Sequence, residues 1–199
     1  KNKVSVKVED AVNFEKKVIG VELPGYEDNK YNDYGLHTIK LPRITLKSKN
    51  AKEFNKKLYN TFSKEYECLI SNKEEHHLYS CQYEYTLKDE LIGIVIECGR
   101  GVQAGGCNMS YNAFYYDAIN DKEITFDEYL LKNAISRNEL EDYIVNSTEY
   151  SNYYSQFGNY EEHEKNIIIT DCLINSSKFV VYIEDIFSID GRSKLEIKR

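Results

Sequence analysis

The chain has 199 residues, of which 41% are hydrophobic and 30% charged, and its formal net charge is -7. This is the composition of a globular domain that can bury its own core, so disordered and fibrous proteins are excluded. The acidic balance argues against a nucleic-acid partner, because such proteins gather Lys and Arg on the face that meets the phosphates.

Residues 1–33 predict an N-terminal β-hairpin extension. Valines alternate with polar residues from Val4 to Val8. A second β-rich stretch, Phe14–Leu23, ends at Pro24-Gly25, a pair that breaks strands.

The next expected elements are a strand and a long amphipathic helix. Leu36–Leu46 is extended in character, and its Pro42 is typical of an edge strand or a strand end. Asn50 and Glu53 resemble a helix start, and we expect the helix over Ala51–Cys68. Its apolar residues recur at spacings of three and four, which predicts one buried face: Ala51, Phe54, Leu58, Phe62, Tyr66 and Leu69.

A second hairpin and a third strand follow. Large residues alternate with polar ones over Tyr79–Thr86, and Lys88-Asp89-Glu90 forms a turn into a buried strand at Leu91–Cys98. The glycine-rich stretch Gly99–Gly106 then leads into a strand at Met109–Asp117.

Two short helices and three strands close the chain. Thr125 with Glu128 and Ser136 with Glu139 are capping boxes, in which each side chain satisfies the other's backbone N–H. They predict helices over Phe126–Ala134 and Arg137–Asn146. The closing strands are expected at Ile167–Ile174, Phe179–Phe187 and Leu195–Lys198.

This order of elements does not alternate as βαβ units, so the sequence predicts an α+β fold. We expect a mostly antiparallel sheet on which the long amphipathic helix and the two short helices pack. No internal repeat or linker divides the sequence, which predicts a single domain over residues 1–199. No apolar run is long enough to cross a bilayer.

The glycine-rich connection is the first candidate binding site. It lacks the Gly-Lys-Ser/Thr ending of a phosphate loop and leads into a strand, so backbone at positive φ explains its glycines. The groups in this connection that we name as candidate ligand-binding residues are Arg100, Gly105, Gly106 and Asn108.

A second candidate is the tyrosine-rich segment at residues 150–160. Tyrosine combines a large contact area with a polar tip, which suits recognition of carbohydrate or protein surfaces, whereas packing in the core is the competing explanation. We therefore also name Tyr153 and Tyr154 as candidate ligand-binding residues. A structural subunit that docks a partner through this segment is one alternative function.

No metal, cofactor or catalytic residue is predicted. The adjacent His76 and His77 point to opposite faces of an extended segment, so their imidazoles do not converge. No cysteines have Cys-x-x-Cys spacing, and no Gly-x-Ser-x-Gly or comparable nucleophile motif is present.

The five cysteines leave two interpretations open. In an exported protein, the simplest pairing joins sequence neighbours, Cys68 with Cys81 and Cys98 with Cys107, and leaves Cys172 as a core thiol. In a cytosolic protein all five are buried thiols.

Several segments occur in a recognisable order: Leu41-Pro42-Arg43-Ile44, Phe54-Asn55, Gly105-Gly106-Cys107-Asn108, Tyr111-Asn112-Ala113-Phe114, Lys122–Leu130 and Phe179–Ile186. Together they resemble the DUF3298 and DUF4163 domains of bacterial envelope proteins, such as the anti-sigma factor that senses lysozyme and certain peptidoglycan deacetylases. The resemblance covers residues 34–186. The family's Gly-Gly-Ala-His pattern is replaced here by Gly105-Gly106-Cys107-Asn108, so no role of that histidine is transferred.

The resemblance implies an exported module at the cell surface that binds a protein or cell-wall glycan, or regulates a neighbouring domain. With an exported module, a signal peptide or membrane anchor is expected upstream of Lys1. The hypothesis is therefore a non-catalytic, extracytoplasmic ligand-binding or sensing module. The enzyme alternative is a small cell-wall hydrolase built on Cys107 or on carboxylates near the glycine-rich connection.

Overall fold

A computed structural model describes residues 5–17, 36–71, 77–102, 107–156, 167–184 and 192–199. Side chains are described for these residues except 11–17, 36–39, 63–71, 77–79, 100–102, 107 and 108. The elements are, in chain order, β1 (Val8–Lys17), β2 (Leu36–Ile44), α1 (Lys49–Ser71), β3 (His77–Lys88), β4 (Leu91–Val102), β5 (Cys107–Asp117), β6 (Lys122–Ile124), α2 (Phe126–Lys132), α3 (Arg137–Val145), α4 (Thr148–Ser155), β7 (Ile169–Ile174), β8 (Lys178–Glu184) and β9 (Arg192–Lys198).

The fold class is α+β, as the sequence predicts, but the described strands form two sheets instead of one. One sheet has the order β1-β2-β3-β4-β5-β6, and the other has the order β7-β8-β9. β1 with β2, β5 with β6 and both pairs of the smaller sheet are antiparallel. β2 and β3 are parallel, with Thr38 opposite Ser80 and Ile39 opposite Cys81. A parallel pair arises here because the long helix α1 carries the chain back to the end of the sheet at which β2 began.

The contacts of the chain divide it into two compact units. Unit 1 is built mainly from Glu84–Val95 and Tyr111–Arg199, and unit 2 from Val6–Tyr83 and Ile96–Ser110. β3, β4 and β5 each contribute residues to both units.

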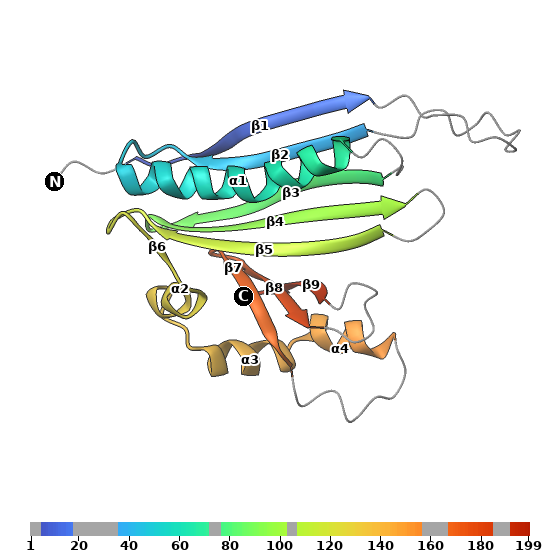
Figure 1. Ribbon diagram of the computed structural model, residues 1–199. Coiled ribbons are helices and arrows are strands. Elements are labelled where there is room, and N and C mark those ends of the chain that lie inside the picture. Colours follow the sequence, from blue (N-terminus) through green and yellow to red (C-terminus); the bar gives the residue numbers. More distant parts are fainter. Residues whose placement is uncertain (1–4, 18–35, 72–76, 103–106, 157–166, 185–191) are drawn as a thin grey trace, which may run out of the picture. The chain divides into compact units, whose positions relative to one another are not determined.

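In unit 2, α1 packs along β2 (Figure 1). Its first turn is capped by the Ser48 hydroxyl, which accepts a hydrogen bond from the backbone N–H of Ala51 over 3.1 Å. The side-chain amide of Asn55 both accepts from the N–H of Ile44, over 2.9 Å, and donates to the carbonyl of Ile44, over 2.8 Å. This paired bond fixes the position of the helix on the strand, while its inner face buries Ala51, Phe54, Leu58 and Phe62.

The N-terminal hairpin expected within residues 1–33 is wrong for the described residues. β1 runs without a turn from Val8 to Lys17, and its partner is β2, with Val8 opposite Ile44 and Lys17 opposite Leu36. A β-bulge between Asp10 and Val12 absorbs one residue. Residues 18–23 of the expected second strand lie outside the described residues.

The core of unit 1 forms around the smaller sheet. β8 buries five consecutive residues, Phe179–Ile183, because both of its faces are covered. One face packs against α2, α3 and α4, and the other against residues of β4 and β5. The buried helix residues on the first face are Tyr129, Leu130, Leu140, Ile144 and Tyr150.

Side chains form hydrogen bonds with the backbone groups on the outer edge of β7, which has no strand beside it in the smaller sheet. The N–H of Cys172 donates to the Tyr115 hydroxyl over 3.2 Å, and the N–H of Ile174 donates to the Tyr129 hydroxyl over 3.1 Å. Arg137 Nη1 donates to the carbonyl of Ile169 over 3.0 Å. These bonds occupy backbone groups with which a further strand could otherwise pair.

Both predicted capping boxes are confirmed, at the N-terminus of α2 and at that of α3. α2 ends two residues earlier than expected, since Ala134 has a left-handed φ of 56°. β6 and α4 were not predicted from the sequence. The signal for α4 was Ser147, whose side chain accepts from the N–H of Tyr150 and caps the helix.

Candidate functional site

The candidate residues of the glycine-rich connection are only partly placed. Gly105 and Gly106 lie outside the described residues. Arg100 lies in β4 and Asn108 in β5, so the strands extend further into this connection than expected, but neither side chain is described. A ligand site at Arg100, Gly105, Gly106 and Asn108 stays a prediction, and so does a nucleophile at Cys107.

The candidate tyrosines lie on α4 and contact the core of unit 1. The rings of Tyr153 and Tyr154 are 5.2 Å apart and perpendicular, and both pack partly buried against the core. The hydroxyls of Tyr153 and Ser193 are hydrogen-bonded over 2.6 Å, which ties α4 to β9. Tyr150 is buried. Packing therefore occupies much of this surface, which weakens the docking alternative, and a ligand contact by Tyr153 or Tyr154 stays a prediction.

The expected cysteine pairing is wrong. Cys81 and Cys98 form a disulfide with each other, with their Cα atoms 4.2 Å apart, so neither Cys68 with Cys81 nor Cys98 with Cys107 is a pair. Cys172 is a buried free thiol, as expected, and burial raises its pKa well above the ordinary value.

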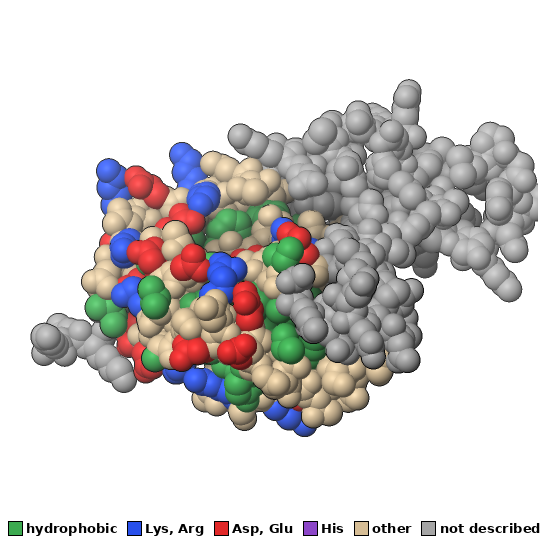
Figure 2. Space-filling model, turned by 90° about the horizontal axis from the view of Figure 1, so that it is seen from below, with side chains coloured by type: hydrophobic (Ala, Val, Ile, Leu, Met, Phe, Trp, Pro, Cys, Tyr) green, Lys and Arg blue, Asp and Glu red, His purple; other side chains and the backbone are tan. Residues whose placement is uncertain are grey.

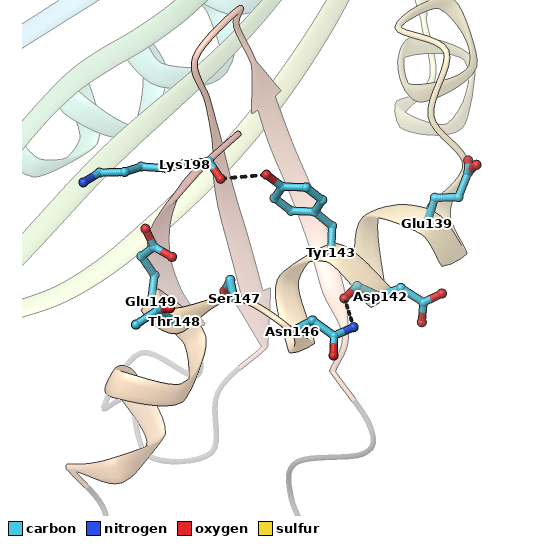
Figure 3. A pocket seen from close by; sticks show the side chains of 8 residues that line it. All are labelled: Glu139, Asp142, Tyr143, Asn146, Ser147, Thr148, Glu149 and Lys198. Carbon is cyan, nitrogen blue, oxygen red and sulfur yellow. Dashed lines mark hydrogen bonds between the residues drawn. The ribbon is translucent and has the colours of Figure 1, made fainter.

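An open pocket of about 540 Å³ lies where α3 and α4 meet the end of β9 (Figure 3). We call it the α3–α4 pocket. Its main side chains are Asp142 and Tyr143 of α3, Asn146 directly after α3, Thr148 and Glu149 of α4, and Lys198 of β9. Seen from the side of these helices, acidic and basic side chains are interspersed over the surface (Figure 2).

Tyr143 is the central aromatic group of this pocket, and its position is held at two points. Its hydroxyl donates to the carbonyl of Lys198 over 2.8 Å, and its ring meets the Phe179 ring edge to face, with centroids 5.2 Å apart. Even so, 39% of Tyr143 is exposed. A preorganised, exposed tyrosine is the kind of group that dominates recognition surfaces.

Carboxylates outnumber cations among the side chains that line the pocket, and outside this lining the Arg199 guanidinium lies 5.2 Å from the centroid of the Phe179 ring that Tyr143 contacts. Glu139 is used by the protein itself, since its carboxylate accepts from the N–H and hydroxyl of Ser136, and these bonds lower its pKa. Within the described part of the chain, the carboxylates of Asp142 and Glu149 form no ion pair. The pocket therefore offers two unpaired acidic groups beside an aromatic ring.

Sequence reasoning missed this pocket, although part of its signal was present. Glu139, Asp142, Tyr143 and Asn146 are spaced as one face of a helix, and that helix was predicted correctly. The contribution of β9 could not be anticipated, because it depends on a contact across 55 residues.

The described residues hold no group of three or more His, Cys, Asp or Glu side chains that could bind a metal ion. None of the described helices combines the length and hydrophobicity needed to cross a bilayer.

The sequence matches no protein-family model and no curated protein. Its fold is similar to that of a DUF3298 family protein from Pseudomonas aeruginosa PAO1, with a TM-score of 0.57, 10% sequence identity, and coverage of 98% of this chain and 95% of that chain. A DUF3298 family member from Bacteroides fragilis NCTC 9343 aligns with a TM-score of 0.46 and 10% identity, over 100% of this chain and 92% of that chain. At 10% sequence identity these similarities show the fold alone. The likeness in fold is taken from the Pseudomonas aeruginosa protein, which has the higher TM-score.

Proposed function

We propose that this chain, which has a DUF3298-type fold, is an extracytoplasmic, non-catalytic binding module. Its ligand enters the α3–α4 pocket. The observation that carries the proposal is Tyr143, an exposed aromatic ring fixed at both ends and flanked by the unpaired carboxylates of Asp142 and Glu149. Pockets that bind ligands typically combine an aromatic surface with a few fixed polar groups.

The disulfide supports the extracytoplasmic part of the proposal. Disulfides persist in oxidising compartments and are rare where glutathione and thioredoxin keep thiols reduced. The Cys81–Cys98 bond joins two neighbouring strands inside unit 2, with both residues buried, so it is part of the core of that unit. This agrees with the exported, surface-tethered module that the DUF3298 resemblance implies.

Binding to insoluble peptidoglycan tests the proposal. We expect the purified protein to sediment with peptidoglycan, and Tyr143→Ala to weaken this binding by about tenfold or more, as truncation of an aromatic anchor does. Tyr143→Phe keeps the ring and should retain most of the binding.

Tyr59→Ala is the matched control. Tyr59 is also 39% exposed but lies on α1 in unit 2, outside the pocket. Equal binding by the wild type and Tyr143→Ala, or no sedimentation of either, would contradict the proposal.

Export is tested separately by the gene. A signal peptide, a lipobox cysteine or a single transmembrane helix encoded upstream of Lys1 supports an extracytoplasmic module. A cytosolic start with no export signal contradicts it.

A further inference from the structure

The groups around Tyr143 suit a ligand with many hydroxyl groups. Each hydroxyl both donates and accepts, so a polyhydroxylated ligand needs donors and acceptors side by side. The α3–α4 pocket supplies the Thr148 hydroxyl and the second N–H of the Asn146 amide, whose first N–H donates to the Asp142 carbonyl over 2.7 Å, and it supplies acceptors from the Asp142 and Glu149 carboxylates. The exposed part of the Tyr143 ring adds a flat apolar surface, on which the C–H face of a sugar ring can pack.

The charges around the ring indicate which sugars fit. Figure 3 shows Asp142 and Glu149 on opposite sides of Tyr143, with the Asp142 carboxylate and the Lys198 ammonium both directed away from the ring. At the start of α4 the Ser147 hydroxyl accepts from the N–H of Tyr150, so one of the N–H groups at this helix end is already occupied. Negative substituents such as uronates and phosphates are therefore disfavoured, and a positive substituent gains from both carboxylates.

We infer that the α3–α4 pocket binds an oligosaccharide of amino sugars with free amino groups, with a sugar ring on Tyr143 and the ammonium groups beside Asp142 and Glu149. This inference rests on the proposed function and names its ligand class. A basic peptide shares the positive charge, and its backbone amides can also bond Asn146 and Thr148, but oligolysine lacks the rigid C–H face that a sugar ring offers to Tyr143, so we commit to a glycan.

Calorimetric titration with three probes tests the inference. The probes are a glucosamine tetramer, the corresponding N-acetylglucosamine tetramer and tetralysine. We expect the glucosamine tetramer to bind about tenfold more tightly than the other two at low salt, and its affinity to fall as the salt concentration rises.

Variants distinguish the contribution of the Tyr143 ring to binding from that of the two carboxylates. Tyr143→Ala should weaken binding of the glucosamine tetramer by about tenfold or more, whereas Asp142→Asn with Glu149→Gln should bring its affinity down to that of the N-acetylated tetramer. Glu184→Gln, an exposed acid at the end of β8 outside the pocket, is the charge control and should bind as the wild type does.

Three results would overturn the inference. They are equal affinity for the two tetramers, binding of the glucosamine tetramer that does not depend on Tyr143, and tetralysine binding that is as tight and as dependent on Tyr143. If peptidoglycan sedimentation depends on Tyr143 but neither tetramer binds, the ligand class is wrong and the proposed function stands. If sedimentation itself is independent of Tyr143, both fail.

Discussion

Asp117 shows how one buried carboxylate organises the turn between β5 and β6. It is 1% exposed, and its carboxylate accepts from the backbone N–H groups of Ile119 and Asn120, each over 3.0 Å, and from the Asn120 amide over 2.6 Å. Lys132 Nζ of α2 lies 3.0 Å from Asp117 Oδ2. Burial works to raise the pKa of Asp117, but the hydrogen bonds from Asn120 and Lys132 outweigh it and lower the pKa to about 2.

We therefore expect Asp117→Asn to lower the free energy of unfolding at neutral pH by about 2 kcal/mol. The pKa of this group falls from 3.8 in the unfolded chain to about 2 in the folded one. Its contribution is thus complete above about pH 4 and is lost as the pH falls toward 2. Urea unfolding across this range measures both effects.

Asp127→Asn is the surface control, since its ion pair with Arg137 is largely exposed and should contribute less than about 1 kcal/mol. If Asp117→Asn lowers the free energy of unfolding no more than Asp127→Asn does, the hydrogen-bond network around Asp117 does not stabilise the fold as we expect.

Tyr129 has a structural role in the core of unit 1. It is 1% exposed, its hydroxyl accepts from Ile174 N–H and shares a hydrogen bond with Thr86, and burial raises its pKa to about 12. Gly93 leaves room for this network, since a Cβ there would lie 3.0 Å from the Tyr129 hydroxyl and 2.9 Å from Leu173 Cδ2.

Tyr129→Phe should lower the free energy of unfolding by about 1 to 3 kcal/mol, because it leaves the N–H of Ile174 and the hydroxyl of Thr86 buried without this partner. Thermal or urea unfolding measures the loss. Tyr143→Phe also removes one hydroxyl, but from an exposed residue, and should cost less. Equal losses in the two variants would contradict the role assigned to Tyr129.

At the scale of elements, the β3–β4 hairpin explains the disulfide. Asp89 and Glu90 form a two-residue turn, with φ values of 51° and 62°. In such a hairpin, residues at equal distances from the turn lie opposite each other, counting back from Lys88 and forward from Leu91. Cys81, seven residues before Lys88, then faces Cys98, seven residues after Leu91. The hairpin predicted from the sequence already places Cys81 opposite Cys98. The pairing was nevertheless predicted wrongly, because the cysteines closest in sequence were paired instead.

Reduction of the Cys81–Cys98 bond should lower the free energy of unfolding by about 3 kcal/mol, because the bond closes a loop of 17 residues in the unfolded chain. Urea unfolding with and without reductant measures this. The variant with both cysteines changed to alanine provides the control, and its response to reductant should be smaller than that of the wild type by this amount. An equal response would show that the bond does not stabilise the protein.

At the scale of the whole molecule, thiol labelling tests the redox state. In the unreduced native protein we expect Cys172 to stay unlabelled, since it is buried and burial raises its pKa. In denaturant without reductant, Cys172 should become labelled while Cys81 and Cys98 stay protected. Peptide mass mapping distinguishes these sites. Labelling of Cys81 and Cys98 without reductant would count against an exported protein.

The sequence by itself determined the α+β class, the capping boxes of α2 and α3, and the turn between β3 and β4. These features depend on residues within a few positions of one another, whose hydrogen bonds and backbone preferences act locally. Only the tertiary structure decided that β1 pairs with β2, that β2 lies parallel to β3, that the strands divide into two sheets, and that α3, α4 and β9 share a pocket. Each of these depends on burial between distant segments, and the alternation of apolar residues shows which face of a strand is buried but not which segment covers it.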